Sequence, residues 1–121
     1  MKFKVYAHAP DDYAKWLAAE KSAPRQAVEL QELAGERLFF ASTCSNCHAI
    51  LGTTATAKIG PDLTHLANRK QIGAGVVENS HDNLVAWLKN PQSLKPGCKM
   101  PNFRFSDEQA QQLTAYLEKM Q

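Results

Sequence analysis

The segment Cys44-Ser45-Asn46-Cys47-His48 constrains the fold of this chain more than any other stretch. Two thiols at this spacing can add to the two vinyl groups of one haem, and a histidine directly after the second thiol can bind the iron. The pattern predicts a haem c attached through Cys44 and Cys47, with His48 as an axial ligand. We therefore expect the rest of the chain to fold around this group.

Length, composition and charge exclude several other classes of protein. The 121 residues suffice for one compact domain and a short appendage, and an apolar fraction of 44% is typical of a globular chain. A net charge of +2 without a concentrated basic face argues against nucleic-acid binding. We expect no membrane span, because no run of 18 apolar residues occurs. A secretory leader is also missing, so we expect a mature domain or a fragment.

The first 23 residues differ from the rest. Residues 1–7 alternate in polarity, which is typical of a strand, although a lone strand has nothing to pair with. Residues 8–24 are interpreted as a connector with a turn or helix start at Pro10 and an apolar patch of Tyr13, Trp16 and Leu17. We expect the haem domain to comprise residues 24–121.

Helical spacing dominates that domain. A first helix is predicted from Pro24, in its first turn, with an apolar stripe at positions 27, 30, 34, 38 and 41. Gly35 inside it is unfavourable by roughly 1 kcal/mol relative to alanine, which suggests that another element approaches closely. A capping sequence at 79–82 predicts a second helix that stops before Pro91. Ser106 and Gln109 form a capping box for the last helix, whose stripe is Ala110, Leu113, Leu117 and Met120.

The two long segments between these helices, 49–80 and 91–105, are predicted to be loops. A haem explains their length, because they can pack on the porphyrin. The expected fold class is all-α, with short helices wrapped around one covalent haem.

Met100 is the predicted sixth ligand of the iron. It lies in the proline-rich loop Pro96-Gly97-Cys98-Lys99-Met100-Pro101, which can hold a thioether at a fixed geometry, and methionine with histidine raises the reduction potential. The other methionines lie near the chain ends, where disorder is common. The other candidates considered are Met1, Met120, His8, His65 and His81.

Three further residues are interpreted as partners of the haem. The carbonyl of Pro61 is expected to accept the Nδ1–H of His48, which fixes the ring. Arg69 and the indole N–H of Trp87 are candidate donors to the haem propionates, with a surface charge and a core aromatic as the alternatives. Lys58, Lys70, Lys95 and Lys99 are expected to form a solvated face, or else to ring the haem edge.

Cys98 lies outside the attachment motif. We expect it to be a semi-buried residue without chemistry, with an intermolecular disulfide as the alternative. The chain is expected to be monomeric.

From Leu30 onward these motifs resemble the class I cytochrome c family. The resemblance rests on the glycine-bearing first helix, Cys44–His48, Gly60-Pro61-Asp62-Leu63, the Met100-Pro101 loop and the last helix. It implies that the first and last helices cross, with Gly35 facing Tyr116. One departure is Cys98, where the family usually has asparagine.

The segments 60–69, 87–92 and 95–101 are similar to the cytochrome domain fused to subunit II of certain bacterial cytochrome c oxidases. Residues 1–17 are similar to the end of the copper-binding domain that precedes it. By this resemblance, residues 1–23 are a remnant of that domain and a linker, and Met1 occupies the position of a copper ligand whose partner residues this chain lacks.

The resemblance implies a one-electron carrier and no enzyme by itself. Electrons would come from a soluble cytochrome c or a quinol-oxidising complex and pass to the copper centre of the oxidase, in the periplasm or at the outer face of the bacterial cytoplasmic membrane. The first alternative is a stand-alone or differently fused periplasmic cytochrome c. A haem enzyme with an open sixth site and a metal-free Cys-x-x-Cys redox protein are the others.

Overall fold

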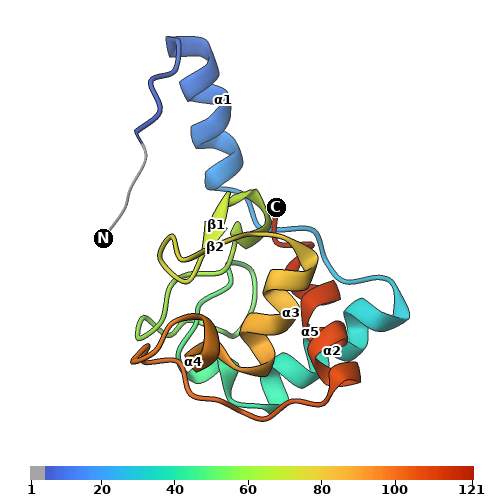
Figure 1. Cartoon of the computed structure of the whole chain (residues 1–121). Coiled ribbons are helices and arrows are strands. Elements are labelled where there is room, and N and C mark those ends of the chain that lie inside the picture. Colours follow the sequence, from blue (N-terminus) through green and yellow to red (C-terminus); the bar gives the residue numbers. More distant parts are fainter. Residues whose placement is uncertain (1–4) are drawn as a thin grey trace.

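A computed structural model describes residues 5–121 (Figure 1). The described helices are α1 (Pro10–Glu20), α2 (Leu30–Ala41), α3 (His81–Lys89), α4 (Pro91–Leu94) and α5 (Asp107–Leu117). Two single 3₁₀ turns, η1 (Cys44–Asn46) and η2 (Leu66–Asn68), and an antiparallel hairpin of β1 (Gln71–Ile72) and β2 (Val77–Glu78) complete the elements. None of the described helices is long and apolar enough to cross a bilayer.

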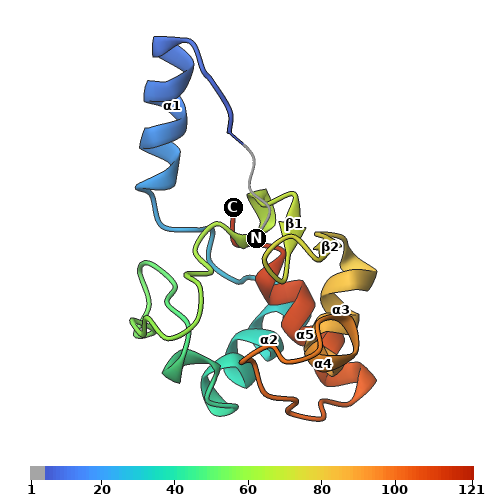
Figure 2. The ribbon, with the colours of Figure 1, turned by 60° about the vertical axis from the view of Figure 1, so that its left-hand side comes forward.

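The crossing of α2 and α5 forms the centre of the fold, and both views show the two helices in contact (Figures 1 and 2). Gly35 lies at the contact, where a Cβ atom would be 2.0 Å from the backbone oxygen of Gln112 and 2.8 Å from Cβ of Tyr116. Phe39 packs on the Tyr116 ring with centroids 5.8 Å apart. The predicted close approach at Gly35 is confirmed, and this is why the helix tolerates a glycine there.

The last helix matches its prediction closely. The Ser106 hydroxyl accepts the Gln109 N–H, and the Gln109 side chain accepts the Ser106 N–H, as the capping box requires. The whole predicted stripe, together with Tyr116, is buried. Likewise α3 is capped by Ser80 and ends at Lys89, with Asn90, the residue before Pro91, as its C-cap.

The predicted start of the first helix is wrong. It begins at Leu30 instead of Pro24, and Leu30 itself is 85% exposed. The buried positions are Glu32, Gly35 and Phe39, so the buried face is displaced from the predicted apolar stripe. The physical reason is Glu32, whose carboxylate accepts the N–H of the N-cap residue Glu29 and fixes the start of the helix there.

Two elements were missed in the predicted loops. Pro91 is buried and begins α4, where its missing N–H costs no hydrogen bond. The hairpin pairs Gln71 with Glu78 and Ile72 with Val77 around a turn in which Gly73, Ala74 and Gly75 all have positive φ. Each strand of the hairpin has only two residues, which is too short for an alternation of apolar and polar residues to be recognised in the sequence.

The N-terminal part contains a full helix where a connector with a turn or helix start was expected. Helix α1 projects from the rest of the molecule in both views, and none of its residues is buried (Figures 1 and 2). Tyr13 and Trp16 form part of the predicted patch, with ring centroids 5.6 Å apart. The predicted strand falls partly on residues 1–4, which lie outside the described residues, and residues 5–9 form no regular element.

Glu32 in α2 contacts both the segment before this helix and the residues after α5. Its side chain is 1% exposed, and its Oε1 lies 3.1 Å from Nη2 of Arg25 and 2.9 Å from Nζ of Lys119, while Oε2 accepts the Val28 N–H at 2.9 Å. The Val28 hydrogen bond and then that of Lys119 lower the pKa of Glu32 to about 2, against the opposing effect of burial. A buried carboxylate with these partners stays ionised and joins the start of α2 to the residues after α5.

We predict that Gly35→Ala destabilises the protein by about 3 kcal/mol, because the new methyl group meets the Gln112 backbone. In an exposed helix the same change would stabilise by roughly 1 kcal/mol, so the sign is diagnostic. Chemical denaturation measures the free energy of unfolding. Gln31→Ala, at an exposed position of the same helix, is the control and should change stability by less than about 0.5 kcal/mol. An equal or higher stability of Gly35→Ala would contradict the crossing.

We predict that Glu32 contributes to the acid sensitivity of the fold. Because the pKa of Glu32 is about 2 in the folded protein, below its ordinary 4.5, its contribution is complete above pH 4.5 and is lost as the pH falls towards 2. The difference in Tm between the wild type and Glu32→Gln should therefore shrink over that range. A difference that is independent of pH would contradict this role of the charge.

Candidate functional site

The two motif thiols lie shortly after α2, with Cys44 at the start of the turn η1 and Cys47 directly after it. Thr43 has a positive φ of 65°, which turns the chain out of the helix, and the N–H groups of Cys47 and His48 then donate to the Cys44 carbonyl at 3.1 and 3.0 Å. Both thiols are free. Burial raises the pKa of Cys44 to about 11, whereas a redox dithiol needs a thiolate of lowered pKa. The raised pKa therefore argues against a redox dithiol at this position.

The imidazole of His48 is held from one side by the segment Gly60-Pro61. Its Nδ1–H donates to the Pro61 carbonyl at 2.7 Å, which is the hydrogen bond expected from the sequence. Because a carbonyl can only accept, Nδ1 carries the proton and the lone pair of Nε2 is available to a metal. Gly60 packs on the ring so tightly that a Cβ atom there would be 2.6 Å from Cε1 of His48. Sequence reasoning missed this contact.

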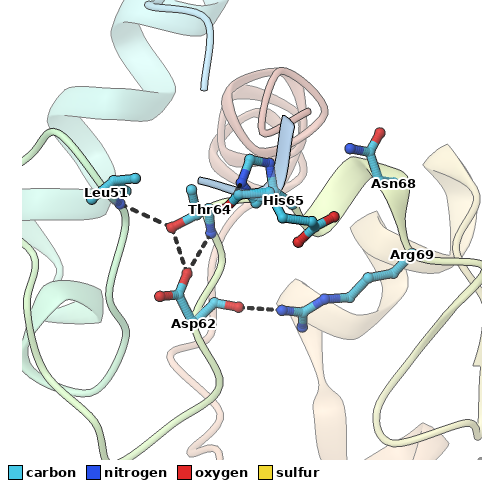
Figure 3. Close-up of a pocket in the computed structure, with 7 residues that line it drawn as sticks. Leu51, Asp62, Thr64, His65, Asn68 and Arg69 are labelled. Atoms are coloured by element: carbon cyan, nitrogen blue, oxygen red, sulfur yellow. Dashed lines mark hydrogen bonds between the residues drawn. The ribbon is translucent and has the colours of Figure 1, made fainter. Parts of the chain in front are cut away.

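Arg69 lines a pocket of about 340 Å³ beside this segment (Figure 3). Its guanidinium donates to the backbone carbonyl of Asp62. The Asp62 carboxylate accepts the Thr64 N–H at 2.8 Å and the Thr64 hydroxyl proton at 2.5 Å, and Thr64 Oγ1 in turn accepts the Leu51 N–H at 2.9 Å. Arg69 is exposed, so its guanidinium can also reach an anionic group; its pairing with a propionate stays a prediction.

The charge state of Asp62 follows from the same contacts. Burial, the largest effect, raises its pKa, but the two hydrogen bonds from Thr64 and the charges of Arg69 and His65 together leave the pKa below its ordinary value. An ionised Asp62 therefore stabilises the turn that carries Pro61.

Met100 and Trp87 contact each other. The indole N–H of Trp87 donates to Sδ of Met100 at 3.1 Å, and both side chains are partly buried. The sequence instead suggested Trp87 as a partner of a propionate, and that pairing stays a prediction. A thioether sulfur has two lone pairs, so one can accept this hydrogen bond while the other binds a metal.

The other candidate ligands that lie among residues 5–121 make contacts elsewhere. Met120 is 2% exposed in the core, and Met1 lies outside the described residues. His8 stacks on Trp16, and Nε2 of His65 lies 3.1 Å from the Glu20 carbonyl, which joins the domain to the end of α1.

His81 bridges α3 and α5. Its Nδ1 lies 3.0 Å from Glu118 Oε1 and its Nε2 lies 2.8 Å from Gln111 Oε1. The hydrogen bond with Gln111, followed by that with Glu118, raises the pKa of His81 despite some burial. Both ring nitrogens of His81 thus face acceptor oxygens in a structural contact. Among the candidates that the structure describes, Met100 is left with a half-buried, available donor atom.

Lys95, one of the four lysines expected on a solvated face or at the haem edge, has a structural contact. Nζ of Lys95 donates to the Gly73 carbonyl at 2.8 Å, which links the segment after α4 to the hairpin turn. A Cβ atom at Gly73 would lie 2.7 Å from Cζ3 of Trp87, so the turn also packs against the indole. The lysine was expected on a solvated face, and its contact with the hairpin was missed because the hairpin itself was not predicted.

The residues present fit a haem c. Cys44 and Cys47 supply two free thiols at the spacing of the vinyl groups, His48 presents an oriented imidazole, and Met100 supplies a thioether. Gly60 leaves the space that the imidazole occupies. This donor set would suit a covalently attached haem with two protein ligands to its iron.

Comparison with known proteins agrees with this chemistry. The family model described as "Cytochrome c" matches residues 33–121. The cytochrome c oxidase subunit 2 of Alkalihalophilus pseudofirmus is 36% identical over 99% of this chain, and that of Bacillus subtilis is 32% identical over 98%. The chain spans about a third of these relatives, 34% of each.

A shorter relative matches along nearly its whole length. The cytochrome c of Tetrahymena pyriformis is 32% identical over 78% of this chain and 94% of its own. With the helical architecture described above, these matches show that the chain belongs to the cytochrome c family and has the class I cytochrome c fold.

Proposed function

We propose that this chain carries one haem c, bound covalently through Cys44 and Cys47, and transfers single electrons with His48 and Met100 as axial ligands. The observation that carries the proposal is the 2.7 Å hydrogen bond from His48 Nδ1 to Pro61, since it leaves Nε2 as the free donor directly after the two thiols. Family membership supports electron transfer in general. The haem, when bound, supplies an iron that alternates between Fe(III) and Fe(II).

Each protein group contributes through position and electron donation. The thioether bonds would hold the porphyrin at the end of α2, so its place is fixed by the crossing with α5. The Pro61 carbonyl makes His48 a stronger donor, and the Trp87 N–H orients the Met100 sulfur. Because the same ligands suit both oxidation states, the protein needs little rearrangement when an electron moves.

We also propose that the electron acceptor is the copper centre of a cytochrome c oxidase subunit II, to which this domain is fused. The oxidase relatives match 97–99% of the chain and thus include α1, whereas the family model begins at residue 33. Fusion would raise the effective concentration of haem at the copper. Residues 1–23 would then be the remnant of the copper domain and linker, and residues 24–121 the cytochrome domain.

The alternative is a stand-alone or differently fused periplasmic carrier. It is favoured by the match with Tetrahymena cytochrome c, but that match leaves out about a fifth of this chain. In either case the domain alone would perform no net catalysis. The donor would be a soluble cytochrome c or a quinol-oxidising complex, and the site of action the periplasm or the outer face of the cytoplasmic membrane.

The ligand proposal predicts that Met100→Ala abolishes the weak far-red absorption of the ferric protein while the haem stays attached. Met120→Leu is the matched control, because Met120 is buried in the core, and it should keep the band. Ferric visible spectra and haem staining of a denaturing gel measure both properties. Retention of the band in Met100→Ala would assign the sixth position to another residue.

The acceptor proposal predicts that the reduced protein is reoxidised by the isolated copper domain of a related oxidase subunit 2, at a rate proportional to the concentration of that domain. Stopped-flow absorption of the haem measures the rate, and the same domain without copper is the control. No reoxidation above that control would favour the stand-alone alternative.

A further inference from the structure

The loop that carries Met100 has few backbone constraints of its own. It begins with a turn in which the Cys98 N–H donates to the Lys95 carbonyl at 3.1 Å, with Pro96 and a positive φ of 78° at Gly97 in the central positions. Beyond Cys98, within the part of the chain that the structure describes, no backbone–backbone hydrogen bond involves residues 99–105. Side chains must therefore hold Met100 in place.

The amide of Gln92 is the side chain that reaches this backbone. Its Nε2 lies 2.8 Å from the Cys98 carbonyl and 3.1 Å from the Met100 carbonyl, and its Oε1 accepts the Gly97 N–H at 3.0 Å. The same nitrogen also lies 3.1 Å from Sγ of Cys98. One side chain thus contacts the backbone of the loop at three successive points on the way to Met100.

These contacts also fix the orientation of the amide. The Gly97 N–H can only donate and the two carbonyls can only accept, so a flipped amide would place like groups against each other at every contact. The two hydrogens of Nε2 match the two carbonyls, which are stronger acceptors than the thiol.

The backbone of Gln92 is held in a helical turn. It lies in α4 directly after the buried Pro91, and the Lys95 N–H closes this helical turn on the Pro91 carbonyl at 2.9 Å. Trp87 on the preceding helix holds the sulfur of Met100 from the other end of the residue. Met100 is thereby fixed at its carbonyl by Gln92 and at its sulfur by Trp87.

We infer that Gln92 is a positioning residue that keeps the Met100 loop closed, so that the thioether stays within reach of the iron. The inference rests on the proposed role of Met100 as a ligand. Loss of the Gln92 contacts should raise the population of the open loop, in which the sulfur has left the iron, without affecting haem attachment at Cys44 and Cys47.

Two variants of the haem-loaded chain test the inference. Gln92→Leu removes every hydrogen bond of the amide. Gln92→Glu keeps an acceptor for the Gly97 N–H but turns a carboxylate oxygen towards the Cys98 and Met100 carbonyls. Gln26→Leu, an exposed position before α2, is the matched control for the change from glutamine to leucine.

The first readout is the pH at which the far-red band of the ferric protein disappears. When opening of the loop is coupled to the release of one proton, a tenfold rise in the open population lowers this midpoint by about one pH unit in both Gln92 variants, with no change in Gln26→Leu. The second readout is hydrogen exchange of the Gly97 amide, which should accelerate in Gln92→Leu and stay slow in Gln92→Glu.

The outcomes separate the inference from the function on which it rests. A wild type with the band, together with unchanged midpoints and unchanged Gly97 exchange in both variants, would overturn the role of Gln92 alone. A wild type without the band would contradict Met100 as the ligand, and the inference would fall with it. Circular dichroism of the variants must match the wild type, so that a lower midpoint reports on the loop and not on global unfolding.

Discussion

The close crossing of α2 and α5 at Gly35 is the constraint on which the rest of the structure depends. No other residue fits there, because a single methyl group would overlap the backbone of Gln112. The crossing holds α2 in place, and the turn η1 with Cys44 follows the end of this helix, with Cys47 directly after the turn. Glu32 reinforces the same contact through Lys119, which joins the residues after α5 to the first turn of α2. The attachment site is thus an extension of the helical core.

The two candidate ligands are held by different means. His48 follows the rigid turn η1, and its ring is fixed by a backbone carbonyl and a glycine on the segment Gly60-Pro61. Met100 lies in the loop between α4 and α5, and its position depends on two side chains of α3 and α4, Trp87 and Gln92. Side-chain contacts with a loop are lost more readily than a ligand built into the core. The methionine side is therefore the labile half of the site.

Local patterns predicted what depends on local interactions. Neighbouring residues determine the capping box at Ser106, the end of α3 before Pro91 and the buried stripe of α5. Gly35 indicated a tertiary contact, because a glycine inside a helix is unfavourable in free energy. The start of α2 was misplaced because the hydrogen bond from the Glu29 N–H to Glu32 fixes it, and glutamate is not one of the usual N-cap residues. The bonds of Trp87 and Gln92 to the Met100 loop were not predicted, since they depend on how separate segments fold together.

Covalent attachment at Cys44 and Cys47 can be measured by the intact mass of the chain after expression with a haem maturation system, combined with thiol titration. The account predicts the added mass of one haem on the peptide that contains Cys44 and Cys47, and a single titratable thiol, that of Cys98. An unmodified chain with all three thiols titratable would contradict it.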